Sequence, residues 1–286
     1  MKIKLIAAFS LPLLFTLSAV RAVGPGASSA GPNDFDRFNS ASSPDGKSAS
    51  NYVDRAKRKE AAGDFAGAIA DYTAAIGVAP KSVVAHFNRG YLLSAYARFK
   101  EAIFDFDVVI REDPRASTAY LYRGQAHAEM GQRKAALSDY DHAIQNASTT
   151  VDGDMVRAKA SSAKGDYAAA ASLFAKAKRR SARDTHVLNS VAWFKATCPN
   201  GSFRNGQEAV QDSTKACEIS KWKDGDLIDT LAAAYAETGD FDQAIKYQRQ
   251  ALASRPPGAP DSLNDMQRHL RSYQARKPIR EESKLR

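Results

Sequence analysis

The sequence predicts an all-α protein, an α-solenoid of stacked antiparallel helix pairs that is closed by a C-terminal capping helix. Three observations predict this fold. A pattern repeats every 34 residues through the centre of the chain, apolar residues within each repeat recur at helical spacing, and glycine or proline marks several of the turns. One helix pair cannot bury its own apolar face, so such units must stack.

Composition excludes several other classes of protein. Of the 286 residues, 44% are hydrophobic and 26% are charged, which is typical of a folded chain rather than a disordered one. The mean hydropathy of -0.44 excludes a polytopic membrane protein. The two cysteines are too few for a disulfide-dense miniprotein or a zinc module built from cysteines.

Residues 1–22 predict a secretory signal peptide. Lys2 and Lys4 precede an apolar stretch, and Ala22 is the small residue after which we expect cleavage. The stretch is shorter than the ~20 residues that span a bilayer and contains Pro12, although an uncleaved membrane anchor is the alternative. We therefore expect an exported protein, and the sequence leaves open whether it is periplasmic or extracellular.

Residues 23–48 are rich in Gly, Ser, Pro and Ala, and Phe35 and Phe38 are their only bulky anchors. Such a segment cannot bury enough apolar surface to offset the entropy of ordering. The sequence therefore predicts a flexible tether between the signal peptide and the repeats.

The repeats are aligned on a turn that reads Gly63-Asp64-Phe65 in the first of them. Four repeats follow one another without a gap, at 49–82, 83–116, 117–150 and 151–184. Each turn is followed by an alanine, which lets two helices approach closely, and four residues later by an aromatic residue. These pairs are Ala68 and Tyr72, Ala102 and Phe106, Ala136 and Tyr140, and Ala170 and Phe174.

The first helices also share a signature. An aromatic or imidazole residue is followed by Arg, Gly and a further large residue, which are His86, Arg89, Gly90 and Leu93 in the second repeat and Tyr120, Arg123, Gly124 and His127 in the third. The first repeat has Tyr52 but departs from the signature at Ala56 and Lys59. This pattern resembles the tetratricopeptide repeat family. The resemblance implies a tetratricopeptide superhelix that acts as a non-catalytic scaffold for protein partners.

The fifth unit, 185–224, has a lengthened turn between Thr197 and Gly206. The stretch around this turn resembles a long-turn repeat found in some exported bacterial tetratricopeptide proteins. The sixth unit, 225–258, is regular and brings the repeats to six over 49–258.

The last segment, 259–286, is predicted to hold the capping helix and a basic tail. The helix would begin at Asp261 or Ser262 and end near Ala275. Its apolar side would cover the open end of the stack. That side consists of Leu263, Met266, Leu270 and Tyr273.

Two charged positions recur with the repeat. The arginines are Arg55, Arg89, Arg123 and Arg157, and the aspartates are Asp71, Asp105 and Asp139. Antiparallel packing places these positions at similar heights on neighbouring helices, which predicts a structural Arg–Asp ladder. The fourth repeat has Leu173 in place of the aspartate, and its polar first helix, 151–164, is predicted to be the weakest part of the stack.

Positions 2, 5, 6, 9, 12 and 13 of the first helices are predicted to line the concave side and to bind a peptide or helix. The candidates are Phe87, Asn88, Tyr91, Leu121, Tyr122, Gln125, Lys159, Asn189 and Trp193. Aromatic side chains suit such a surface, although each ring alone can instead pack against neighbouring helices. Asn88 occupies a position of the clamp found in chaperone-binding members of the family, but the Lys and Arg partners of that clamp are absent.

No pattern predicts catalysis. The five histidines show no metal-ligand spacing, and neither a nucleophile motif nor a glycine-rich phosphate loop is present. We therefore expect no enzyme activity, no metal and no cofactor. Cys198 and Cys217 lie ~15 Å apart along the helix axes, so we expect buried thiols rather than the disulfide that export would permit.

The predicted function is an adaptor of the cell envelope or extracellular space that binds an unidentified protein or peptide, and not nucleic acid. An alternative is a structural protein tethered through its basic tail, since residues 267–286 hold seven basic and two acidic residues. That tail either contacts an acidic surface or is a solvated, frayed end. A catalytic or small-molecule-binding protein is the third alternative.

Overall fold

The computed structural model describes residues 48–255, 262–281 and 285. The predicted signal peptide and all but the last residue of the predicted tether lie outside these residues. The described residues form two compact units, which we call the N-terminal unit (48–147) and the C-terminal unit (148–255 with 262–281 and 285).

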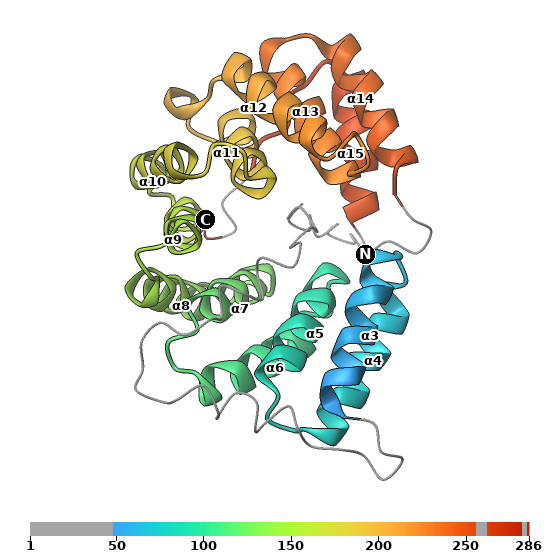
Figure 1. Ribbon diagram of the computed structural model, residues 1–286. Helices are drawn as coiled ribbons and strands as arrows, with labels where there is room; N and C mark the ends of the chain where they lie inside the picture. Colours follow the sequence, from blue (N-terminus) through green and yellow to red (C-terminus); the bar gives the residue numbers. More distant parts are fainter. Residues whose placement is uncertain (1–47, 256–261, 282–284, 286) are drawn as a thin grey trace, which may run out of the picture. The chain divides into compact units, whose positions relative to one another are not determined.

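The N-terminal unit consists of three antiparallel helix pairs (Figure 1). They are α3 (Ala49–Ala61) with α4 (Phe65–Val78), α5 (Val83–Ala95) with α6 (Phe99–Glu112), and α7 (Ser117–Glu129) with α8 (Arg133–Asn146). The second helix of one pair also packs against the first helix of the next, α4 on α5 and α6 on α7. The pairs are therefore stacked in chain order.

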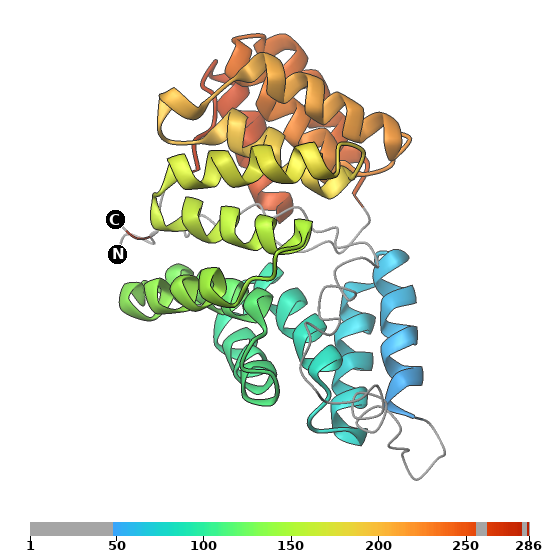
Figure 2. The same ribbon diagram turned by 60° about the vertical axis from the view of Figure 1, so that its left-hand side comes forward.

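The C-terminal unit also contains three pairs, whose helices can be followed in Figure 2. They are α9 (Val151–Lys164) with α10 (Tyr167–Arg180), α11 (Thr185–Thr197) with α12 (Gly206–Ile219), and α13 (Gly225–Thr238) with α14 (Phe241–Ala253). The long turn of the fifth repeat contains a single 3-10 turn, Gly201–Phe203. Helix α15 (Ser262–Gln274) packs on α14 and α13.

The predicted all-α fold of stacked helix pairs with a capping helix is confirmed. In α15, the predicted contact residues Met266 and Tyr273 are buried, as is His269. The six helix pairs fall into the two compact units, three in each. The boundary falls just before α9, the helix whose polar sequence we expected to be the weakest part.

Local sequence explains the turns between helices. The aspartate of the Gly-Asp turn caps the second helix, because Asp64 accepts a hydrogen bond from the Gly67 amide at 2.9 Å and Asp166 accepts one from Ala169 at 3.1 Å. The preceding glycine has a positive φ, for example 79° at Gly63. At the same position of the second repeat, Ala97 is held at φ 56°, where a side chain is strained.

The close-approach positions form the core. Ala68, Ala102, Ala136 and Ala170 are all 0% exposed. The aromatic residues that follow them, Tyr72, Phe106, Tyr140 and Phe174, are buried as well. A small residue thus brings two backbones together, and a ring one turn later fills the space beside them.

Candidate protein-binding surface

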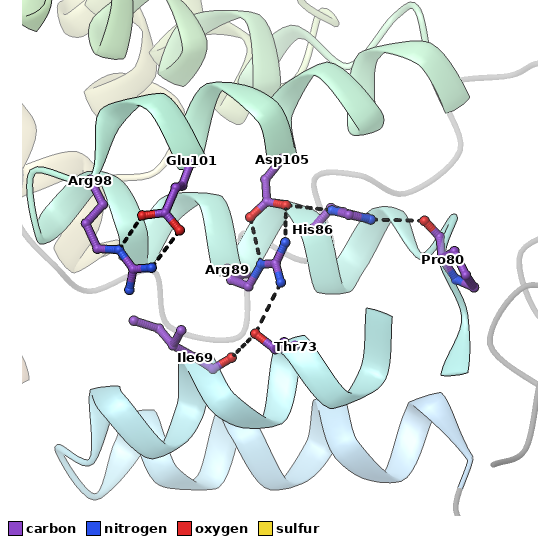
Figure 3. Close-up of polar contacts among 8 residues, drawn as sticks. All are labelled: Ile69, Thr73, Pro80, His86, Arg89, Arg98, Glu101 and Asp105. Carbon is purple, nitrogen blue, oxygen red and sulfur yellow. Dashed lines mark hydrogen bonds and ion pairs between the residues drawn. The ribbon is translucent and has the colours of Figure 1, made fainter. Parts of the chain in front are cut away.

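The Arg–Asp ladder of the N-terminal unit is present as predicted. In the second repeat, Arg89 donates from Nε and Nη2 to the two oxygens of Asp105 at 2.9 and 2.7 Å (Figure 3). His86 Nδ1 lies 2.7 Å from the same carboxylate, which is fully buried. The same two-bond pairing joins Arg55 to Asp71 and Arg123 to Asp139.

Two ladder arginines also reach the preceding pair. Arg89 Nη1 donates to Thr73 Oγ1 at 3.1 Å, and Arg123 Nη1 donates to Asp107 Oδ1 at 2.6 Å. Each guanidinium therefore joins its own helix pair to the one before it. The ladder fixes the relative position of α3, α5 and α7, which carry the predicted binding residues.

The fourth repeat uses a different carboxylate. Arg157 pairs with Asp154 on its own helix, at 2.6 Å, because Leu173 occupies the aspartate position. Asp154 is 0% exposed and also accepts from Lys176 and Arg180. These cations hold the pKa of Asp154 below its usual range against the opposing effect of burial.

We use "first-helix face" for the surface of the first helices: α3, α5 and α7 in one unit, and α9, α11 and α13 in the other. Three predicted binding residues of the N-terminal unit, Phe87, Leu121 and Tyr122, lie in the core instead. The ring of Tyr122 packs edge-on against Phe87 and stacks on Phe106. Neighbouring helices already cover these side chains, so they offer a partner little area.

The other candidates of this unit keep part of their surface. Asn88 and Tyr91 are half-buried, and the Tyr91 ring packs edge-on against Tyr122 with centroids 5.1 Å apart. Gln125 is 8% exposed, and its Oε1 has no hydrogen-bond partner among the described residues. The amide therefore retains a buried acceptor.

In the C-terminal unit, the structure brings Lys159 of α9 to α11. Its Nζ lies 3.3 Å from His186 Nε2. Burial lowers the pKa of Lys159 to about 8. Burial, together with the charge of Lys159, also lowers the pKa of His186 well below its ordinary value. The sequence gives no sign of this role for His186, because a lone histidine carries no positional signal.

Asn189 and Trp193 follow His186 on the same face of α11, at i+3 and i+7. Asn189 is 1% exposed, and neither its Oδ1 nor its Nδ2 has a partner among the described residues. The half-buried Trp193 ring lies 5.9 Å from His269 of the capping helix. The first-helix face of this unit therefore combines a cation, an unpaired amide and an indole.

Comparison with known families decides the identity of these helix pairs. Two models described as tetratricopeptide repeat match the sequence, one over residues 53–107 and the other over residues 226–255. The chain is a tetratricopeptide repeat protein. Its fold is that of a protein–protein interaction scaffold, in a family that is generally non-catalytic.

Solved structures share this fold at low sequence identity. A tetratricopeptide repeat protein from Parabacteroides merdae is 14% identical, with 79% of this chain and 84% of that chain covered at a TM-score of 0.51. A monomeric mutant of IFIT1 with Gppp-AAAA is 16% identical, with 82% of this chain and 57% of that chain covered at a TM-score of 0.60. A search of curated proteins finds no match. These similarities support the fold alone.

The two thiols of this tetratricopeptide repeat protein are free and buried, which confirms the prediction from helix geometry. Burial raises the pKa of Cys217 to about 12. Cys198 is fixed at the start of the long turn, where Arg204 donates to its carbonyl at 2.8 Å.

The described residues contain neither a candidate metal site nor a candidate membrane-spanning helix. No group of three or more His, Cys, Asp or Glu side chains has the arrangement of a metal site. Within the same part of the chain, no helix has both the length and the apolar character that crossing a membrane requires.

Proposed function

We propose that this tetratricopeptide repeat protein is an exported, non-catalytic adaptor that binds a protein segment on its first-helix face. The observation that carries the proposal is a buried amide with unused hydrogen-bonding capacity in each unit, Gln125 in one and Asn189 in the other. A buried polar group without a partner costs about 1–3 kcal/mol, so such groups call for an explanation. A bound peptide would provide one.

The chemistry of the two amides suits a peptide backbone. Once a side-chain rotation brings these buried atoms to the surface, Gln125 can accept from a backbone N–H, and Asn189 can both accept and donate. A half-buried ring lies four residues from Asn189 along α11, at Trp193, and another lies on α5, at Tyr91. Such rings contribute contact area at a small cost in entropy. Amide and ring together favour a segment that presents both backbone and apolar side chains.

The rigid framework supports the same proposal. The two-bond Arg–Asp pairs hold the first helices of the N-terminal unit in place before any partner arrives. A pre-organised surface loses little entropy on binding, so the ordering cost falls on the ligand.

A pull-down tests the proposal. Residues 23–286 are immobilised and exposed to an envelope extract, beside a variant with Asn88→Ala and Tyr91→Ala. Both residues are half-buried, so the variant is expected to fold, which circular dichroism checks. We expect a protein that is retained by the parent chain and lost from the variant, because side chains that contribute more than about 1 kcal/mol dominate such contacts.

The matched control replaces exposed residues on a second helix of the same unit, Lys100→Ala and Phe104→Ala in α6. It should retain the partner as the parent does. Equal retention by all three proteins, or a partner lost only from the control, would contradict binding at the first-helix face of α5.

Export is the second part of the proposal and rests on the basic start and short apolar stretch of residues 1–22. N-terminal sequencing of the protein from its native cells is expected to begin at Val23. A mature chain that begins at Met1 in the membrane fraction would support the anchor alternative instead.

A further inference from the structure

The chain reverses direction after the capping helix. Helix α15 ends at Gln274, and Arg276 takes a positive φ of 53°. Two hydrogen bonds close the turn, one from the Lys277 amide to the Ser272 carbonyl at 2.9 Å and one from Ser272 Oγ to the Lys277 carbonyl at 2.8 Å. Residues 278–281, which we call the tail segment, then return along the first helices of the fifth and sixth repeats.

The tail segment bonds to the end of α11. The Glu281 amide donates to the Thr197 carbonyl at 2.9 Å, and Arg280 Nη1 reaches the Ala196 carbonyl at 3.4 Å. The last carbonyls of a helix have no partner within the helix, so the tail segment satisfies groups that would otherwise need water or a ligand. Arg280 Nη2 also pairs with Glu237 near the end of α13, at 2.7 Å.

The apolar residue of the tail segment is Ile279. It packs against the alanine clusters of α11 and α13, and Trp193 borders the same cluster. Alanines such as Ala192 and Ala233 leave a shallow surface on which a branched side chain fits. Ile279 therefore anchors the segment between two first helices.

The last residue of the segment is acidic. The Trp193 indole N–H donates a hydrogen bond to the Glu281 carboxylate, and Lys159 of the fourth repeat contributes a favourable charge. Burial nevertheless raises the pKa of Glu281 to about 7. The carboxylate is thus recognised by two of the residues that the sequence had nominated for partner binding, Lys159 and Trp193.

These contacts cover the partner-binding positions themselves. Lys159 and Trp193 occupy position 9 of the fourth and fifth repeats, and Ala196 and Thr197 occupy positions 12 and 13 of the fifth. These positions were predicted to face inward. The first-helix face of the C-terminal unit is therefore already occupied by a short segment of the same chain.

We propose that the tail segment is a built-in ligand of this face, and that a partner binds there by displacing it with a segment of the same chemistry. That chemistry is a branched apolar residue, then a guanidinium, then a carboxylate. The proposal rests on the proposed function and adds to it the kind of segment that is bound and the step that exposes the site.

The tail segment has the properties of a displaceable ligand. Within residues 278–281, Ile279 supplies the apolar anchor, and the carboxylate is held against a desolvation cost. Its advantage over a partner is covalent attachment, which gives an effective concentration on the order of millimolar. A partner must therefore exceed the affinity of the segment itself, and release of the segment should raise the affinity for any competitor.

Fluorescence anisotropy of a labelled peptide tests the proposal. The probe has the sequence of residues 276–286, and the full-length protein is compared with its Ile279→Asp variant, in which a charge replaces the apolar anchor. The control is Gln274→Asp, which adds the same charge at an exposed position at the end of α15. We expect the probe to bind Ile279→Asp at least about tenfold more tightly than it binds the parent or the control.

Two further measurements keep the result interpretable. In a Trp222→Phe background, where Trp193 is the remaining tryptophan, Ile279→Asp should shift the emission to the red while circular dichroism is unchanged. A probe with glutamine at the position of Glu281, or with aspartate at that of Ile279, should bind the released protein at least about tenfold more weakly than the parent probe.

The proposal is overturned if the probe binds folded Ile279→Asp no more tightly than the parent, or if all three probes bind alike. The probe comes from the chain itself, so neither result depends on finding a natural partner. A failed pull-down with Asn88→Ala and Tyr91→Ala would count against the proposed function and leave this measurement intact.

Discussion

The two units of the chain bury their carboxylates in different ways. In the N-terminal unit, Asp71, Asp105 and Asp139 receive the same two-bond contact from an arginine at the same repeat position. In the C-terminal unit, each buried aspartate has its own set of partners. Asp154 pairs with three cations, whereas Asp229 faces Gln248 and His269.

This difference shows what a repeated sequence does and does not specify. A residue pair that recurs at a fixed spacing produces the same contact each time, because the helix pairs that carry it are alike. Once one member is lost, as at Leu173, the arginine pairs elsewhere and the network becomes particular to that repeat. The five predictions below test this contrast. The chain also supplies a reporter, since both tryptophans, Trp193 and Trp222, lie in the C-terminal unit.

Removal of a ladder carboxylate should have the largest effect. Asp105→Ala leaves Arg89 and His86 facing a buried site without an acceptor, and should destabilise the N-terminal unit by about 3–5 kcal/mol. Urea denaturation followed by far-ultraviolet circular dichroism measures the loss. Tryptophan fluorescence should show the C-terminal unit unchanged.

The matched control is Asp107→Ala. This carboxylate also pairs with an arginine, but its side chain is 44% exposed, so the loss should be about 0–1 kcal/mol. Equal losses for the two variants would mean that burial does not set the strength of the ladder.

Leu173→Asp restores the ladder sequence in the fourth repeat, yet we expect it to destabilise the C-terminal unit by about 1–3 kcal/mol. Arg157 is already engaged by Asp154, and Leu173 packs against a hydrophobic cluster, so the new carboxylate would enter an apolar site without a partner. Tryptophan fluorescence during urea denaturation measures the change. A stabilised variant would show that the ladder can be transferred by sequence alone.

Two repeats of the N-terminal unit differ from the C-terminal unit at the closest approach of their helices, whereas the first repeat has Ala56 there. Gly90 and Gly124 lie where the C-terminal unit has Ala158 and Ala192. A Cβ on Gly124 would lie 2.9 Å from Cε1 of Tyr140, so Gly124→Ala should cost about 1–3 kcal/mol by overpacking.

The control for this change is Gly77→Ala, in which the new Cβ meets nothing within 4 Å. It should stabilise the same unit by about 0.5–1 kcal/mol, because alanine favours the helix. Circular dichroism in urea compares the two variants, and a neutral Gly124→Ala would show that the pair can separate without cost.

Acid should weaken the ladder through Asp71. The hydrogen bonds from Arg55, with help from Lys59, hold the pKa of Asp71 below its usual range. The unfolded chain therefore takes up its proton first, at about pH 4, and the contribution of Asp71 to stability is present above that pH and lost below it. In Asp71→Asn, the urea midpoint should fall less steeply between about pH 5 and 2 than in the parent. An unchanged slope would contradict the assignment.

The smallest effect is expected at a strained turn. Ala97 is held at φ 56°, whereas the matching Gly131 has φ 71° without strain. Ala97→Gly should stabilise the N-terminal unit by about 0.5–1 kcal/mol, and Gly131→Ala should destabilise it by a similar amount. Thermal denaturation of the two variants should move the midpoint in opposite directions, and shifts of the same sign would refute the strain argument.

The sequence alone determined the features that repeat. The period predicted the helix pairs, the alanine and aromatic core positions and the Arg–Asp ladder, because each depends on contacts within one pair or between neighbouring pairs. The free, buried state of Cys198 and Cys217 followed from helix geometry in the same way.

Only the tertiary structure decided which candidate residues are accessible and what covers them. Position within the repeat does not distinguish buried Tyr122 from half-buried Asn88, which both occupy position 6, since the difference comes from what packs around each side chain. The contact of Arg280 with the Ala196 carbonyl joins residues 84 apart in the chain. No periodic pattern records a contact of that kind, because the tail segment occurs once and its partners lie on a surface that exists only after the repeats have stacked.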